Sequence, residues 1–192
     1  MAQEGDAAPM RLPPGQRLVD SPPVIHVGEV PTFDPATWNL RVEGAVEHTL
    51  RLAWRDVLAL PQVELVADMH GGTGWSCRGL RWDGVPLRAL VAACDPHPAV
   101  RFLLARDAEL YSACVPLEAD VVNEALLALR LGGEPLASER GGPLRLVVPS
   151  RYAWKSVKWV RTLVFAEHDE PGFWESRGAH PSGDPWRAQR LA

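Results

Sequence analysis

Apolar and polar residues alternate over several short stretches in the first third of this chain, which is the pattern of half-buried β-strands. The alternation is clearest at residues 40–44 (LRVEG), and residues 50–52 and 63–67 continue it. Between these stretches, residues 54–60 (WRDVLAL) predict a short helix that ends before Pro61. The pattern therefore predicts short strands separated by turns.

Apolar runs in the second half of the chain predict further strands at residues 100–105, 144–148 and 157–165, and residues 87–93 predict a second helix. Several short strands with few helices and no internal repeat are typical of an α+β domain. We therefore expect an α+β fold in which the short strands pair in mixed or antiparallel fashion.

The segment from residue 117 to residue 129 is expected to contain a strand, a loop and a helix. The helix is predicted by apolar residues at helical spacing, which are Val122, Ala125, Leu126 and Leu129. Two glycines follow at positions 132 and 133, and glycine commonly ends a helix. We therefore expect this helix to end at the two glycines.

A chain of 192 residues with 46% hydrophobic and 23% charged residues is long and apolar enough to form one domain with a sizeable core. Residues 1–20 are polar and contain proline and glycine without a period, which is typical of a flexible arm. We expect the domain itself at residues 21–165, and a C-terminal extension packed on the same domain at residues 166–192.

The composition excludes several classes of function. A formal net charge of −4 at pH 7 gives no overall basic character for nucleic-acid binding. Cys77, Cys94 and Cys114 form no CxxC pair, so a disulfide scaffold, a zinc ribbon and a haem attachment site are not expected. No apolar run approaches the about 18–20 residues of a membrane span, and the N-terminus resembles no export signal. We therefore expect a soluble, cytoplasmic protein.

Only two of the 20 lysine and arginine residues are lysines, and these two, Lys155 and Lys158, lie three positions apart. With Arg151 and Ser156 they occupy a polar loop between two predicted strands. Cationic side chains and loop amides together suit a phosphate or another anion, and an exposed cationic turn explains the pattern equally well. Positions 155 and 158 would face opposite ways on a regular strand, so both lysines reach one ligand only if Lys155 belongs to the loop.

Three further features are candidates for binding. Residues 70–76 contain three glycines, which let a backbone approach a ligand closely, although a tight turn with a hydrogen-bonded His70 is the alternative. Arg145 lies in an otherwise apolar strand and needs an anionic partner or several acceptors, and a structural salt bridge is the commoner outcome. His26 lies in the apolar run at residues 24–27, where a histidine is more often a core residue than a ligand.

Several of these stretches follow one another in an order that resembles a known family. In chain order the motifs are WNLRVEG at residues 38–44, HGGTGWS at 70–76, WDGVPL at 82–87, GGPLRLVVP at 141–149, KSVKW at 155–159, GFWESRG at 172–178 and GDPW at 183–186. Over residues 22–187 the chain resembles the molybdopterin-binding domain of the sulfite oxidase superfamily. The closest resemblance is to short bacterial members related to the catalytic subunit that reduces protein methionine sulfoxide.

The resemblance implies a sulfite-oxidase-like fold and a cofactor. Members of this family hold molybdenum through the dithiolene of a pyranopterin, molybdopterin, and move an oxygen atom between the metal and a substrate such as sulfite or a sulfoxide. The loop that binds the phosphate end of this cofactor matches Lys155, Ser156, Val157 and Lys158. The other positions implied to bind the cofactor are Ile25, His26, His70, Gly71, Thr73, Arg140 and Arg145.

One position departs from the family pattern. The family loop reads His-Cys-x-Thr-Gly-Trp-Ser, and its cysteine thiolate is the protein's ligand to molybdenum, whereas this chain has Gly71 at the matching position. We therefore assign no residue as a metal ligand and none as catalytic. Cys77 lies six residues later, up to about 20 Å away along an extended chain, and nothing in the spacing brings it to the metal.

Three functions remain open from the sequence. The chain is an oxidoreductase with an altered metal site, a non-catalytic protein that binds molybdopterin or a related pterin phosphate, or a scaffold that has lost the cofactor. Arg145 and the two lysines argue against the third function, because burying unpaired charge is costly. We expect a molybdopterin-dependent oxidoreductase-like protein, with the presence of molybdenum and catalysis left open. Its expected partners are a small-molecule substrate or pterin and a separate electron-transfer protein.

Overall fold

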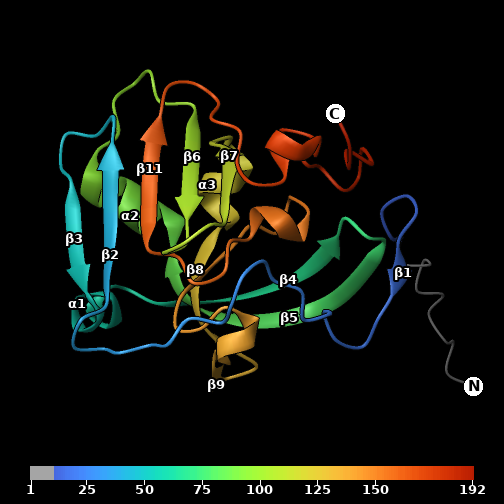
Figure 1. Cartoon of the computed structure of the whole chain (residues 1–192), viewed down its shortest axis with the longest axis horizontal. Coiled ribbons are helices and arrows are strands. Elements are labelled where there is room, and N and C mark those ends of the chain that lie inside the picture. The colour runs from blue at the N-terminus through green and yellow to red at the C-terminus, as the bar shows by residue number, and fades with distance from the viewer. Residues whose placement is uncertain (1–10) are drawn as a thin grey trace, which may run out of the picture.

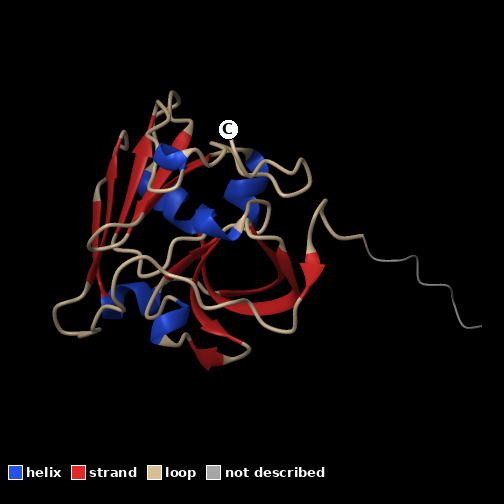
Figure 2. Ribbon diagram, turned by 45° about the vertical axis from the view of Figure 1, so that its right-hand side comes forward, coloured by secondary structure: helices blue, strands red, loops and turns tan. Residues whose placement is uncertain are grey.

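The computed structural model describes residues 11–192, and its regular structure consists of two β-sheets with a few short helices (Figure 1). The five-stranded sheet stands at one side of the molecule. The six-stranded sheet lies across its lower end and extends toward the other side, where it curls (Figure 2). The α+β class predicted from the sequence is confirmed.

The five-stranded sheet consists of β2 (Asn39–Gly44), β3 (Leu50–Ala53), β6 (Phe102–Arg106), β7 (Ser112–Pro116) and β11 (Thr162–Ala166). Its strand order is β3-β2-β11-β6-β7. β11 runs parallel to β2, and the other neighbouring pairs are antiparallel. Leu40 and Val42 on β2 are fully buried while Arg41 between them is exposed, as the alternation in the sequence predicts.

The six-stranded sheet consists of β1 (Arg17–Leu18), β4 (Val63–Gly71), β5 (Trp75–Pro86), β8 (Leu126–Leu131), β9 (Glu134–Pro135) and β10 (Arg145–Val147). Its main path is β1-β5-β8-β10, with β4 paired to β5 and β9 paired to β8. The β4–β5 ladder is irregular between Ala67 and Met69, and the β5–β8 ladder between Asp83 and Gly84. Such bulges bend strands, which agrees with the curl of this sheet.

Two apolar clusters hold the sheets together. The main core lies between the sheets and includes Leu40 and Phe165 of the five-stranded sheet and Leu127 of the six-stranded sheet. The second cluster belongs to the six-stranded sheet and includes Trp75 and Trp82. The helices are α1 (Trp54–Ala59), α2 (Leu87–Cys94) and α3 (Ala119–Glu124), and Figure 1 shows α2 and α3 behind the five-stranded sheet.

Two predictions about individual elements were wrong. The helix expected to reach the glycines at 132 and 133 ends at Glu124 as α3, and residues 126–131 form the strand β8, which turns into β9 at the glycines. The strand expected at residues 157–165 begins only at Thr162, and residues 157–161 lie in the loop before it.

Part of the N-terminal segment and the C-terminal segment pack on this framework. Residues 1–10 of the expected flexible arm lie outside the described residues, while Arg17 and Leu18 pair in parallel with β5. Beyond β11 the chain forms loops and a short 3-10 helix, Glu175–Arg177. The amide of Phe173 donates to the carbonyl of Ser112 at 2.9 Å, which ties this C-terminal segment to β7.

Candidate functional site

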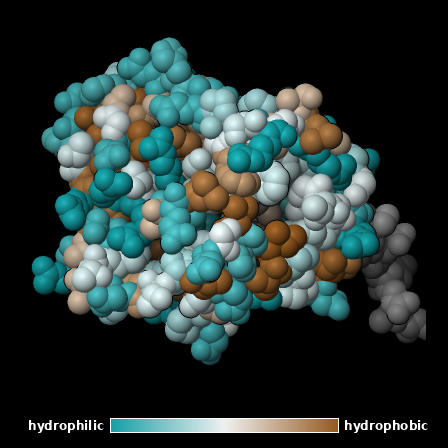
Figure 3. Space-filling model, in the orientation of Figure 1, coloured by the Kyte–Doolittle hydropathy of each residue, from teal (hydrophilic) through white to brown (hydrophobic). Residues whose placement is uncertain are grey.

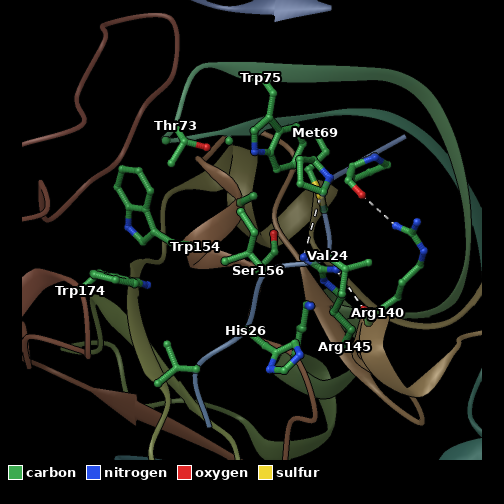
Figure 4. Close-up of a pocket in the computed structure, with 18 of the residues that line it drawn as sticks. Val24, His26, Met69, Thr73, Trp75, Arg140, Arg145, Trp154, Ser156 and Trp174 are labelled. Atoms are coloured by element: carbon green, nitrogen blue, oxygen red, sulfur yellow. Dashed lines mark hydrogen bonds between the residues drawn. The ribbon is translucent and has the colours of Figure 1, made fainter. Parts of the chain in front are cut away.

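A cavity of about 580 Å³ opens beside the six-stranded sheet. Trp75 and Trp82 of β5 line it from the sheet. Three segments far apart in the sequence complete the lining, drawn from residues 22–27, residues 153–159 and residues 174–191. Figure 4 shows Trp154 and Trp174 on one side of the cavity and Arg140 and Arg145 toward the other. In Figure 3, hydrophobic residues gather near the middle of the same face that Figure 1 shows.

Three cationic side chains, Arg140, Arg145 and Lys158, line one part of this cavity. Their hydrogen bonds go mainly to backbone oxygens, with Arg140 donating to Pro22 at 3.1 Å and Lys158 to Glu139 at 2.7 Å. Arg145 donates to the carbonyl of Arg140 at 3.0 Å. Among the described residues none of the three forms an ion pair with a carboxylate. No ion pair within residues 11–192 therefore neutralises the positive charge of this group.

Burial and mutual repulsion depress the pKa values of two of these cations. Burial above all lowers the pKa of Arg145 to about 10. Burial likewise lowers the pKa of Lys158 to about 8, with the positive charges of Arg145 and Arg140 adding to the effect. A lowered pKa means that the charged form lacks a compensating partner, so an anion bound here would stabilise the charged forms.

Several buried donors at the cavity also lack an acceptor. The Nε of Arg145 and the indole N–H groups of Trp82 and Trp154 are buried without a hydrogen-bond partner in the described part of the chain. Buried N–H groups are normally paired, so these donors suit a ligand that carries acceptors. The Ser156 hydroxyl accepts from the amide of Val148 at 3.0 Å, which leaves its own proton to donate. A phosphate attached to a heterocycle fits this donor set.

The glycine-rich turn lies against two indole rings. A Cβ on Gly71 would lie 2.1 Å from the Cε2 and Nε1 atoms of Trp75. A Cβ on Gly72 would lie 2.6 Å from Cζ3 of Trp154. Neither position admits a side chain unless the ring shifts, so glycine at both positions allows the backbone to approach the rings closely.

Most of the cofactor-binding residues expected from the sequence come together at this cavity. Those that line it are Ile25, His26, Gly71, Thr73, Arg140, Arg145, Ser156 and Lys158. His70, Val157 and Lys155 do not line it. His70 is buried with its Nδ1 2.7 Å from the Ser76 hydroxyl, and burial lowers its pKa. Val157 packs in the main core.

Lys155 is fully buried and faces away from the cavity lining. Its ammonium forms an ion pair with the carboxylate of Glu175 and donates to the backbone oxygens of Cys114 and Pro181. Arg151 is also buried and forms ion pairs with Glu118 and Asp120. Of the cationic residues in this loop, only Lys158 reaches the cavity.

Sequence reasoning did not select the aromatic residues of the lining, which are Trp75, Trp82, Tyr111, Trp154, Trp159 and Trp174. The chain has eight tryptophans, and five of them line one cavity. The sequence shows the number of tryptophans, but it does not show that five of them meet at one cavity, because they belong to β5 and to two separate loops. The Tyr111 hydroxyl donates to the carbonyl of Trp154 at 2.6 Å and so fixes the position of that loop.

No cysteine of the chain lines the cavity. The three thiols are free and buried, and Cys77 lies with its Sγ 3.6 Å from the carbonyl of Asp20. Burial raises the pKa of the Cys77 thiol, and it raises the pKa of Cys94 to about 11 and that of Cys114 to about 12. Within residues 11–192, no three His, Cys, Asp or Glu side chains are grouped to hold a metal ion.

Comparison of the sequence with known protein families identifies the class of protein to which this fold and cavity belong. Residues 27–174 match the family described as the oxidoreductase molybdopterin binding domain, and the chain belongs to that family. The chain is therefore an oxidoreductase-like domain whose cofactor is molybdopterin. The cationic group and the unpaired donors of the cavity fit the phosphate and heterocycle of this cofactor.

Particular relatives show how far the likeness extends. The chain is 40% identical over 182 residues to an uncharacterized oxidoreductase, YuiH, of Bacillus subtilis, covering 94% of this chain and 92% of that protein. It is 31% identical to the protein-methionine-sulfoxide reductase catalytic subunit MsrP of Gluconobacter oxydans, covering 74% of this chain and 51% of that subunit. The sulfane dehydrogenase SoxCD of Paracoccus pantotrophus matches with a TM-score of 0.64 and 28% identity, covering 72% of this chain and 40% of that chain. The chain thus spans about half the length of the reductase subunit and less than half the length of the dehydrogenase chain.

Proposed function

We propose that the cavity holds molybdopterin with its phosphate end against Arg140, Arg145, Ser156 and Lys158. The observation that carries this assignment is the convergence of three cations that lack a carboxylate partner among the described residues. Charge-assisted hydrogen bonds from Arg and Lys are the strongest contacts available to a phosphate. Burying these charges without an anion would cost free energy, which the bound phosphate offsets.

We propose further that the dithiolene end faces the glycine-rich turn, where Gly71 stands at the position of the family's cysteine. The chain then offers no thiolate at that end, because glycine has no side chain and none of the three cysteines lines the cavity. Ile25, His26 and Thr73 line the same cavity and are our candidates for residues that shape this end. The cofactor, when it carries molybdenum, supplies two-electron oxygen-atom transfer.

We propose that the substrate is a small sulfur compound. The support is that both MsrP and SoxCD bear names that refer to sulfur chemistry. In this chain, Trp154 and Trp174 offer apolar, polarisable surfaces at the cavity, and such surfaces suit a thioether or sulfoxide group. Electrons would be exchanged with a separate protein, because no haem-attachment motif is present in the sequence.

The binding assignment is tested by producing the protein in a host that assembles the cofactor and measuring pterin fluorescence and molybdenum per chain. We expect Lys158→Gln to lower the pterin content about tenfold, because a hydrogen bond to a charged group contributes about 1.5–3 kcal/mol. Arg88→Gln is the matched control, since it removes the same charge from an exposed helix residue outside the cavity.

Equal pterin contents in wild type, Lys158→Gln and Arg88→Gln would contradict the phosphate site. Pterin without molybdenum in the wild type would contradict the oxidoreductase proposal and leave a pterin-binding protein. Pterin with molybdenum supports the full proposal, which then calls for assays of oxygen-atom transfer to and from small sulfoxides and sulfite.

The cytoplasmic location expected from the sequence stays a prediction. Within the described residues no helix is both long and apolar enough to cross a membrane. Fractionation of the source cells, followed by detection of the chain with an antibody, measures where the protein resides.

A further inference from the structure

A second cavity, of about 310 Å³, lies on the five-stranded sheet and shares no lining residue with the first. It is lined by Asn39, Arg41, Arg51, Asp107, Ala108, Arg161 and Thr162. These residues come from β2, β3 and β11, from the loop between β6 and β7, and from Arg161 directly before β11. Arg41 alternates along β2 with the core residues Leu40 and Val42, so the cavity is on the face of the sheet opposite the main core.

Strand register brings like charges together at this place. Arg41 on β2 lies directly opposite Arg51 on β3, and Thr162 on β11 is the partner of Arg41 on its other side. Like charges directly opposite each other destabilise a strand pair. One guanidinium nitrogen of Arg41 donates to the Thr162 hydroxyl at 3.0 Å, and Arg51 has no partner in the part of the chain that the structure describes.

Arg161 supplies the third guanidinium and is held in place from two sides. Its Nε donates to the carbonyl of Asn39 at 2.9 Å, and its Cζ lies 5.3 Å from the centre of the Trp38 ring. Burial and the charge of Arg41 lower the pKa of Arg161. The terminal nitrogens of Arg161 donate to no acceptor within residues 11–192, so they remain available to a ligand.

The carboxylate at the cavity does not neutralise these arginines. Asp107 accepts hydrogen bonds at its Oδ1 from the amides of Glu109, Leu110 and Tyr111, at 2.9 to 3.0 Å, and so stabilises its own loop. Among residues 11–192, no ion pair joins Asp107 or any other carboxylate to Arg41, Arg51 or Arg161. The sheet thus carries three arginines around one hollow, and Asp107, the carboxylate that also lines it, forms an ion pair with none of them.

We propose that this hollow is a binding site for a small dianionic oxyanion, such as inorganic phosphate, sulfate or a phosphate monoester. Planar guanidinium groups present paired donors that match the oxygens of such an anion, and the Thr162 hydroxyl adds a polar group between strands. A bound dianion lies between Arg41 and Arg51 and converts their repulsion into two attractive contacts. No step of the proposed molybdopterin chemistry depends on this site.

The test compares thermal unfolding in sodium phosphate with unfolding in sodium chloride at equal ionic strength and pH, for wild type, Arg51→Gln and Arg55→Gln. In chloride we expect Arg51→Gln to melt at or above the wild-type temperature, because it removes a like-charge pair. In phosphate we expect wild type to melt higher than in chloride, and Arg51→Gln to lose that gain. Arg55→Gln is the charge-matched control, because Arg55 is exposed and lies outside both cavities.

Isothermal titration with phosphate separates the two cavities, because the first one also carries cations. We expect Arg51→Gln to weaken one phosphate-binding event about tenfold, the loss of one charge-assisted contact, and Lys158→Gln to leave that event unchanged. Phosphate binding that disappears in Lys158→Gln but persists in Arg51→Gln overturns the proposal, and so does a wild-type protein that phosphate stabilises no more than chloride. Neither result bears on pterin content, so failure here is distinct from failure of the proposed function.

Discussion

At the scale of single residues, the two lysines of the chain have different physical roles although they lie three positions apart. Lys158 reaches the cavity and Lys155 is buried against Glu175. The odd spacing shows from sequence alone that the two side chains cannot face the same way on a regular strand. Which of them meets the ligand depends on the 3-10 turn Ala153–Lys155, and that turn has no clear sequence signal.

Lys158 gives the cavity a pH dependence in the neutral to alkaline range. Its pKa in the folded protein is about 8 against an ordinary value of 10.5, so it loses its charge as pH rises through about 8. A cation attracts a phosphate only while it is protonated, and bound phosphate favours the protonated form. We therefore expect pterin retention after gel filtration to fall between pH 7 and pH 9.

The Lys158→Gln variant supplies the control for this pH dependence. Its lower retention should stay level over the same range, because no titrating group remains at that position. A wild-type retention that is equally high at pH 7 and pH 9 would contradict the role given to Lys158.

At Gly71 the sequence and the structure give different information about the same position. The family resemblance predicts a cysteine at the position where this chain has Gly71, and the structure adds that atoms of the Trp75 ring lie 2.1 Å from where a Cβ would be. Restoring a cysteine is thus not a change at one position alone, because the ring must move for any side chain to fit. Overpacking of this kind typically costs about 1–3 kcal/mol.

At the scale of elements, alternation predicted β2, β3 and β4 well because less exposed and more exposed side chains alternate along most of each predicted stretch. β8 was mistaken for the end of a helix because its residues 126–129 are all buried, so it shows no alternation. The length of β5, from Trp75 to Pro86, was not foreseen, because its glycines and charged residues interrupt any simple period. Its bulge opposite β8 is a tertiary feature without a local signal.

The candidate site was predictable where it depends on charge and not where it depends on shape. Arg145 and Lys158 stand out in the sequence, since each is a cation bordered by apolar residues. The aromatic walls were not predictable, because Trp82, Trp154 and Trp174 come from three separate segments and meet only in the folded chain. Lys155 resembled a ligand because it shares the polar loop with Lys158, and only its buried contacts distinguish it.

The C-terminal segment is held on the domain by backbone hydrogen bonds and by one buried ion pair. Lys155 on the loop after β10 and Glu175 on the following segment are both almost inaccessible to solvent, and Trp174 beside Glu175 lines the cavity. Removing one partner of a buried pair leaves an uncompensated charge, which typically costs about 3–5 kcal/mol. We expect Lys155→Met to lower the free energy of unfolding by about this amount, measured by urea denaturation.

Limited proteolysis distinguishes a local effect of Lys155→Met from a general one. Cleavage should become faster within residues 170–191 before it does elsewhere, because the segment loses its buried anchor. The double variant Lys155→Met/Glu175→Leu should recover much of the lost stability, since no charge is then left unpaired. A double variant no more stable than Lys155→Met would show that the ion pair is not the anchor.

At the scale of the whole molecule, the cavity joins segments that are otherwise independent. Arg140 donates to the carbonyl of Pro22 and to the Ser21 hydroxyl, so a cation at the cavity also positions the segment before residues 24–27. The C-terminal residues 174–191 reach the same cavity from β11. A ligand that fills the cavity contacts both segments at once, and binding to the folded state alone raises stability by mass action.

Hydrogen exchange on cofactor-loaded and cofactor-free protein tests this coupling. We expect loading to slow amide exchange at residues 24–27 and at residues 174–191 together, while exchange in the central strands of the five-stranded sheet changes little. The reason is that these two segments belong to neither sheet and open most readily, so their exchange responds most to a ligand that bridges them. Lys158→Gln protein from the same host, which loads poorly, should keep the fast exchange in both segments. Protection confined to the β4–β5 hairpin would show that the cofactor rests on the sheet alone and that the two segments close over the cavity without it.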